Sequence, residues 1–176
     1  MKTICVYCGS RDGDDPAFAV AAEAIGAGIA ARGMGLVYGA GDVGLMGRVA
    51  SAALKGGAPV AGIIPQHLRS REIDRHDLTE LITVETMHER KMEMFRRADA
   101  FIALPGGPGT LDELIELLTW RQLGLHAKPA HLLNLGGYWD PLLRLLERTV
   151  ERGFASESFL SYLTPHAAPE ALLDAL

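Results

Sequence analysis

The chain has 176 residues, which suits a single domain with a substantial core, and 48% of them are hydrophobic. The formal net charge of -5 gives nucleic-acid binding no electrostatic support. No apolar run approaches the ~20 residues of a membrane-spanning helix, and the first residues enter a strand-like run rather than a signal peptide. With only two cysteines, Cys5 and Cys8, the sequence favours a cytoplasmic protein in a reducing compartment.

Short apolar runs alternate with segments of helical periodicity along the whole chain. Strands are expected at residues 3–7, 35–38, 59–64, 81–84, 99–104 and 130–135, with 99–104 as the central one. Helices are expected at residues 16–32, 45–55, 87–97 and 139–152, after the turn at 105–109, shortly after Ser156 and from Pro169. The polar residues 65–77 are expected to form a loop that reaches over a site. The alternation predicts one α/β domain, residues 1–176, in which a doubly wound parallel sheet has helices on both faces.

The stretch from residue 101 to residue 120 carries the clearest functional signal. A buried strand leads into a turn with glycines at Gly106, Gly107 and Gly109, and a helix follows. The free N–H groups and the positive dipole end of such a helix bind anions, and glycine lets a ligand approach the backbone. Thr110 and Glu113 also fit a capping box with Thr110 as N-cap, so both roles stay open for these two residues. The three glycines favour the functional role, although the turn lacks the Gly-Lys-Ser/Thr ending of a P-loop.

Two more glycine turns follow predicted strands, at Gly9-Ser10 and at residues 39–44 around Gly41. Because the carboxyl ends of parallel strands share one edge of the sheet, all three turns should meet where such sheets bind ligands. Residues 39–44 match G-x-G-x-x-G, the dinucleotide motif. The next strand, at 59–64, ends without the Asp or Glu that would hold a ribose, so NAD binding is disfavoured. A nucleotide-binding turn of another kind stays open.

The helix at 87–97 places Lys91 in the middle of its apolar face and Arg90 at the edge of that face. A cation there must extend to solvent, pair with a carboxylate or meet an anionic ligand, and the sequence leaves these alternatives open. Cys5 and Cys8 form C-x-x-C, but Cys5 lies inside a strand, so two buried structural thiols are favoured over a redox pair. The six histidines form no metal-binding motif, and no metal site is predicted.

Two of these segments resemble motifs of the LONELY GUY family, the cytokinin riboside 5'-monophosphate phosphoribohydrolases, which are often labelled lysine decarboxylases. Residues 105–113 are similar to P-G-G-x-G-T-x-x-E and residues 87–91 to M-H-x-R-K, and shorter similar segments lie at 6–10, 36–39, 43–47 and 71–73. The resemblance implies a Rossmann-like fold, a homodimer with sites near its interface, and no cofactor. It also implies the substrate, a nucleoside 5'-monophosphate, and the reaction, which is hydrolysis of the N-glycosidic bond of adenosine 5'-monophosphates, with or without an N6 substituent, to the free base and ribose 5-phosphate.

The resemblance assigns Arg90 and Glu113 as the catalytic pair. The residues implied to contact the nucleotide are Glu72, Lys91, Gly106, Gly107, Gly109, Thr110 and Thr119, with Gly9, Ser10 and Gly41 as further candidates from the other turns. The chain departs from the family pattern at Ala40, where a third glycine is common, and at Arg11-Asp12, where small residues are common. The alanine methyl group is expected to narrow the pocket, and the departure at Arg11-Asp12 concerns contacts to the base or ribose.

The expected chemistry follows from the charge that develops at C1' of the ribose. A carboxylate such as Glu113 stabilises an oxocarbenium-like state and activates or orients water. Arg90 stays protonated and is therefore expected to orient Glu113 or to hold an anionic group of the substrate. A non-catalytic nucleotide-binding module is the competing class. A pyridoxal-dependent decarboxylase using Lys91 is disfavoured, because no partner for the cofactor is evident. The sequence leaves open whether the base is adenine or an N6-prenylated adenine.

Overall fold

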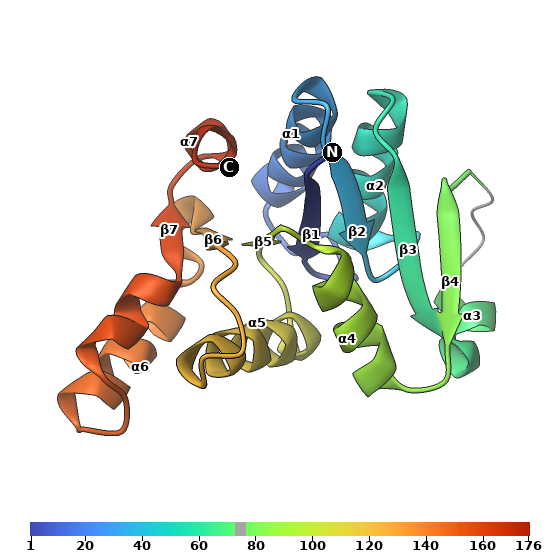
Figure 1. Cartoon of the computed structure of the whole chain (residues 1–176). Helices are drawn as coiled ribbons and strands as arrows, with labels where there is room; N and C mark the ends of the chain where they lie inside the picture. Colours follow the sequence, from blue (N-terminus) through green and yellow to red (C-terminus); the bar gives the residue numbers. More distant parts are fainter. Residues whose placement is uncertain (73–76) are drawn as a thin grey trace.

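Seven strands of the described residues form one sheet, all parallel, in the order β4-β3-β2-β1-β5-β6-β7 (Figure 1). The computed structural model describes residues 1–72 and 77–176, and the side chains of all of these except residues 70–72. The strands are β1 (Thr3–Tyr7), β2 (Gly35–Tyr38), β3 (Val60–Pro65), β4 (Glu80–Val84), β5 (Ala100–Ala103), β6 (Ala130–Leu133) and β7 (Thr164–His166). The helices are α1 (Pro16–Ala31), α2 (Gly44–Lys55), α3 (Gln66–Glu72), α4 (Met87–Arg97), α5 (Pro108–Gln122), α6 (Asp140–Glu151) and α7 (Pro169–Asp174), with short 3-10 helices η1 (Leu135–Gly137) and η2 (Glu157–Tyr162).

The predicted doubly wound sheet is confirmed. Alternate residues of β1 face opposite ways, as the period of a strand requires. Ile4 and Val6 pack in the hydrophobic core under α1, α2 and α7, whereas Cys5 and Tyr7 pack in the core under α4, α5 and α6. Figure 1 shows the two groups of helices on the two faces of the sheet.

The chain order of the strands reverses beside β1. From β1 the sheet grows through β2 and β3 to β4 on one side, and through β5 and β6 to β7 on the other. In sheets of this kind a crevice opens beyond the carboxyl ends of the two strands at the reversal, here β1 and β5. The prediction that residues 99–104 form the central strand was wrong, because β1 is the middle strand and β5 lies next to it.

One further prediction was wrong, and one strand was not predicted. Residues 65–77 were expected to be loop, but Pro65 ends β3 and residues 66–72 form α3; residues 73–76 lie outside the described part of the chain. Strand β7 was not expected, because a three-residue strand containing Pro165 has too short a pattern to detect; it is an edge strand, where proline is tolerated. Among the described residues, no helix is long and apolar enough to cross a membrane.

Candidate active site

The three glycine turns meet at the carboxyl ends of β1, β2 and β5, as predicted. Gly9 donates its N–H to Pro105 O at 3.1 Å, and Met46 donates to Gly9 O at 3.3 Å. A Cβ on Gly9 would lie 3.4 Å from the Cα of Gly106, and a Cβ on Gly44 would lie 2.3 Å from the backbone of Ser10. The backbones touch because these positions carry no side chain, and the turns form one continuous surface at the reversal point of the sheet.

The turn after β5 opens directly into α5, and its first residues are available to a ligand. The helix begins at Pro108 with Gly107 as N-cap, so the alternative prediction of a capping box with Thr110 as N-cap was wrong. Thr110 is instead a buried residue of the first helical turn, so close to the Gly106 backbone that a Cβ there would meet its hydroxyl at 2.1 Å. Gly107 and Gly109 have open space around them. Since the N–H groups of a first helical turn have no partner within the helix, this end of α5 is suited to an anion.

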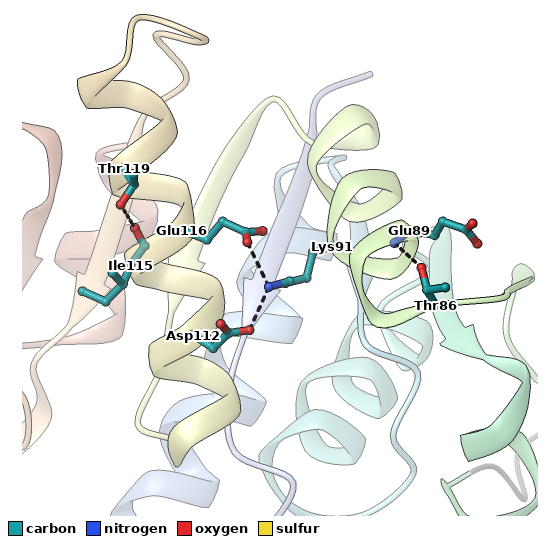
Figure 2. A network of polar contacts seen from close by, with 7 residues as sticks. All are labelled: Thr86, Glu89, Lys91, Asp112, Ile115, Glu116 and Thr119. Atoms are coloured by element: carbon teal, nitrogen blue, oxygen red, sulfur yellow. Dashed lines mark hydrogen bonds and ion pairs between the residues drawn. The ribbon is translucent and has the colours of Figure 1, made fainter.

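Arg90 reaches this surface from α4. The helix is started by Thr86, whose hydroxyl accepts from Glu89 N at 3.1 Å, as Figure 2 shows. One residue further on, the guanidinium of Arg90 is buried and donates to Gly39 O at 2.5 Å. A Cβ on Gly39 would lie 2.0 Å from that guanidinium, so a side chain at position 39 would displace Arg90 from its present position. The buried Nε of Arg90 has no hydrogen-bond partner among the described residues and remains available to an acceptor.

Glu113 lies on the second turn of α5 and is partly exposed as a whole residue. Burial raises the pKa of its carboxyl group from 4.5 to about 7; Arg90 and Lys91 oppose the shift, whereas Asp112 and Glu116 add to it. Burial and the neighbouring Glu113 in turn raise the pKa of Cys8 well above its usual range. A carboxyl group whose pKa is raised toward neutrality near a guanidinium is typical of a catalytic site.

Lys91 pairs with carboxylates on the facing helix. Its ammonium group lies 2.9 Å from Asp112 Oδ2 and 3.0 Å from Glu116 Oε2, and Figure 2 shows it between the two helices. Burial lowers the pKa of Lys91, but its bonds to the two carboxylates outweigh burial and leave the pKa raised. Of the alternatives left open by the sequence, the structure shows ion pairing. The pairs fasten α4 to α5 and so fix Arg90 relative to Glu113.

The remaining predicted residues fall into three groups. Ser10 is exposed at the crevice, and Gly41 is buried against Met46. Thr119 lies 11 residues beyond the start of α5, roughly 16 Å along the helix at its usual rise, and its hydroxyl donates to Ile115 O (Figure 2); the structure does not bring it to the glycine turn. Glu72 is the last residue of α3, and its side chain lies outside the described part.

The backbone conformation at Ala40 is one that glycine adopts more easily than alanine. Its φ is +62°, in the left-handed region that glycine adopts without strain. Its methyl group is buried, and a Cβ on Gly62 of β3 would lie 2.8 Å from it. The methyl group therefore points into the protein against β3, and the expected narrowing of the pocket is not seen.

One residue at the site was missed by the sequence analysis. Tyr138, between β6 and α6, donates its hydroxyl to Gly106 O at 2.7 Å. The segment Gly136-Gly137 before it is a recognisable turn signal. Nothing in the local pattern shows, however, that the turn delivers a phenol to a loop 32 residues away. Cys5 and Cys8 are both buried and free, which confirms the prediction of two structural thiols.

Fold and site together define a Rossmann-like α/β protein in which a glycine turn suited to an anion lies near the carboxyl group of Glu113 and the buried guanidinium of Arg90. Comparison with known proteins agrees. Residues 46–176 match the family described as "Possible lysine decarboxylase". The chain is 50% identical to cytokinin riboside 5'-monophosphate phosphoribohydrolase LOG2 of Arabidopsis thaliana over 158 residues, 90% of this chain and 74% of that protein. It is 51% identical to LOG7 of the same plant, which carries the same enzyme name, over 156 residues, 89% and 72% of the two chains.

The chain therefore belongs to the LONELY GUY family of cytokinin riboside 5'-monophosphate phosphoribohydrolases, as its motifs predict. Among solved structures it is similar to the molybdenum cofactor binding protein of Rippkaea orientalis, with a TM-score of 0.74 and 20% identity over 99% of this chain and 95% of that one. It is also similar to the molybdenum cofactor carrier protein of Chlamydomonas reinhardtii, with a TM-score of 0.72 and 18% identity over 99% of this chain and 94% of that one. At these identities the likeness shows the shared fold alone.

Proposed function

We propose that this protein hydrolyses the N-glycosidic bond of adenosine 5'-monophosphate and its N6-substituted forms, releasing the free base and ribose 5-phosphate. The observation that carries the proposal is Glu113, a carboxyl group with a pKa of about 7 beside Arg90 and next to the glycine turn. Membership of the phosphoribohydrolase family supports the same reaction.

We infer that the 5'-phosphate of the substrate lies on the glycine turn. The N–H groups of residues 107 and 109–110 and the helix dipole of α5 would hold the phosphate. Phosphate contacts of this kind are charge-assisted, at about 1.5–3 kcal/mol each. They would place the ribose over the first turn of α5, toward Glu113 on the second turn.

In the chemical step the C1'–N bond breaks, positive charge develops at C1', and water adds there. Ionised Glu113 would stabilise that charge and accept a proton from the water. A carboxylate with a pKa near 7 is a stronger base than an ordinary one and is still largely ionised just above neutrality. Arg90 is held by its bond to Gly39 O, and its Nε, which has no partner among the described residues, would serve the substrate or Glu113. No cofactor is part of this mechanism.

The same geometry argues against a decarboxylase. A lysine that forms a Schiff base must present a neutral amine, which requires a lowered pKa. The pKa of Lys91 is raised, and two of its hydrogen bonds are made to Asp112 and Glu116. Lys91 is therefore poorly suited to hold pyridoxal phosphate.

The test is hydrolysis of AMP followed by chromatography of adenine and assay of ribose 5-phosphate, with adenosine as the matched substrate without phosphate. AMP should exceed adenosine by at least ~100-fold in kcat/KM, the value of two phosphate hydrogen bonds. Comparable rates would contradict the phosphate assignment. Binding of AMP with no base released would instead identify a non-catalytic nucleotide-binding module. Parallel assays with N6-prenylated AMP would identify the preferred base.

We also propose a homodimer. The outer side of α5 carries a groove of about 610 Å³ lined by apolar and polar residues from Pro108 to Trp120, and Ile115 in it is 39% exposed. Leu123 and Leu125, which follow α5, are each 67% exposed. A second copy packed here would cover this apolar surface and would bring Thr119 of each chain close to the other chain's site.

A further inference from the structure

We propose that Tyr138 is a positioning residue for the phosphate turn: its hydroxyl fixes the peptide between Gly106 and Gly107 so that the Gly107 N–H points at the phosphate of the substrate. The observation is the hydrogen bond from Tyr138 Oη to Gly106 O at 2.7 Å. This inference rests on the proposed function, because it assigns the N–H of Gly107 to the substrate.

The argument begins with the geometry of the peptide unit. A trans peptide is planar, and its C=O and N–H point in opposite directions. A partner that holds Gly106 O on one side therefore directs the N–H of Gly107 to the other side. Between two glycines this plane turns easily, because neither neighbour has a Cβ to restrict it. The ladder of α5 does not hold this carbonyl, since the N-cap bond runs from Leu111 N to Gly107 O. The phenol supplies the restraint that the two glycines lack.

Tyr138 is itself held rigidly. Its ring packs edge-on against Trp139, with the ring centroids 4.8 Å apart, and edge-on against Phe18 of α1, with the centroids 5.5 Å apart. The side chain of Asn134 accepts from Trp139 N at 2.7 Å and donates to Asp140 at 2.7 Å, which locks the turn between β6 and α6. Tyr138 as a whole is 40% exposed, so its hydroxyl is placed by these contacts and not by burial in the core. Such support is what a preorganised binding site needs.

A purely structural pin would use the same hydrogen bond, and the two roles differ in what they affect. If Tyr138 only fastens the β6–α6 connection to the turn, its loss should lower stability and should act alike on substrates with and without phosphate. If it aims Gly107 N–H, its loss should weaken phosphate recognition specifically. In that second case the variant should also bind inorganic phosphate more weakly, although phosphate binding involves no cleavage of a glycosidic bond.

The experiment is Tyr138→Phe, which removes the hydroxyl and keeps both ring contacts. A hydrogen bond of this kind corresponds to roughly three- to tenfold in binding. For AMP, kcat/KM should fall by about that factor, mainly through KM, and the inhibition constant of orthophosphate should rise by a similar factor. The kcat/KM for adenosine should change by less than about twofold, and the melting temperature should change little. The matched control is Tyr162→Phe on η2, where the lost contact is a 3.4 Å bond to Ser158; it should change none of these values.

Two results would overturn the inference: an equal loss for AMP and adenosine, or unchanged orthophosphate inhibition in Tyr138→Phe. Failure of the proposed function looks different, because the parent protein would then release no base from AMP. In that case direct titration with orthophosphate still decides the role of Tyr138: weaker binding by the variant supports it, and equal binding refutes it.

Discussion

The substitution Glu113→Gln should change the rate of hydrolysis and the stability of the protein in opposite directions. Glutamine keeps the shape of the side chain and resembles a protonated glutamate, so the variant should fold and bind AMP. It cannot ionise, however, and cannot stabilise positive charge at C1'. If Glu113 performs the chemical step, kcat should fall by ~10²–10⁴, the usual range for general bases and charge-stabilising groups.

The stability effect should have the opposite sign. The pKa of Glu113 rises from 4.5 to about 7 on folding, so the native state binds this proton more tightly than the unfolded state does. The resulting stabilisation is complete below pH 4.5 and is lost as the pH rises through 7. A shift of this size corresponds to about 3 kcal/mol at 1.36 kcal/mol per pKa unit. At pH 8 the variant should therefore be more stable than the parent by about 3 kcal/mol, or roughly 6–12 °C in Tm for a chain of this length. At pH 4 the two should match.

The assay combines single-turnover hydrolysis of AMP with urea unfolding of parent and variant at pH 4, 6 and 8. The exposed Glu147→Gln on α6 is the matched control and should alter neither rate nor stability. A Glu113→Gln protein that hydrolyses AMP at the parent rate would remove Glu113 from the chemistry. A variant that is no more stable than the parent at pH 8 would contradict the claim that burial raises the pKa of Glu113.

Three further predictions concern other parts of the molecule. Arg90→Lys should lower kcat/KM for AMP by at least about tenfold at nearly unchanged Tm, because an ammonium cannot both reach Gly39 O and present a second donor to the site; a parent-like rate would exclude a guanidinium role. His131 Nδ1 and His166 Nε2 lie 3.0 Å apart, and burial lowers the pKa of both rings, so the folded state favours their neutral forms and its stability should fall as the pH drops below 6.5. In urea unfolding at pH 7 and 5 the parent should lose stability relative to His166→Gln, and parallel losses would contradict this assignment. Light scattering at micromolar concentration should give twice the chain mass, whereas a species of 18.9 kDa alone would contradict the dimer.

The sequence alone determined most of the local structure and pointed to the glycine turns, Arg90 and Glu113 as the candidate site. Strand and helix periods, Pro16 after Asp15 and the glycines after three strands depend only on neighbours along the chain, and these signals are confirmed. A right-handed parallel arrangement then brings the three turns to one edge of the sheet. The motif residues around Arg90 and Glu113 are sufficient to indicate the family.

Only the tertiary structure determined the burial, the ion pairs and the long-range contacts of these residues. Burial raises the pKa of Glu113 to about 7, and no local pattern encodes that burial. Lys91 was equally compatible with solvent, a ligand or an ion pair until α5 placed Asp112 and Glu116 beside it. Tyr138 shares no local signal with Gly106, since their contact exists only after β5 and β6 have paired. Desolvation and long-range pairing depend on residues far apart in the chain, so they appear only when the sheet is assembled.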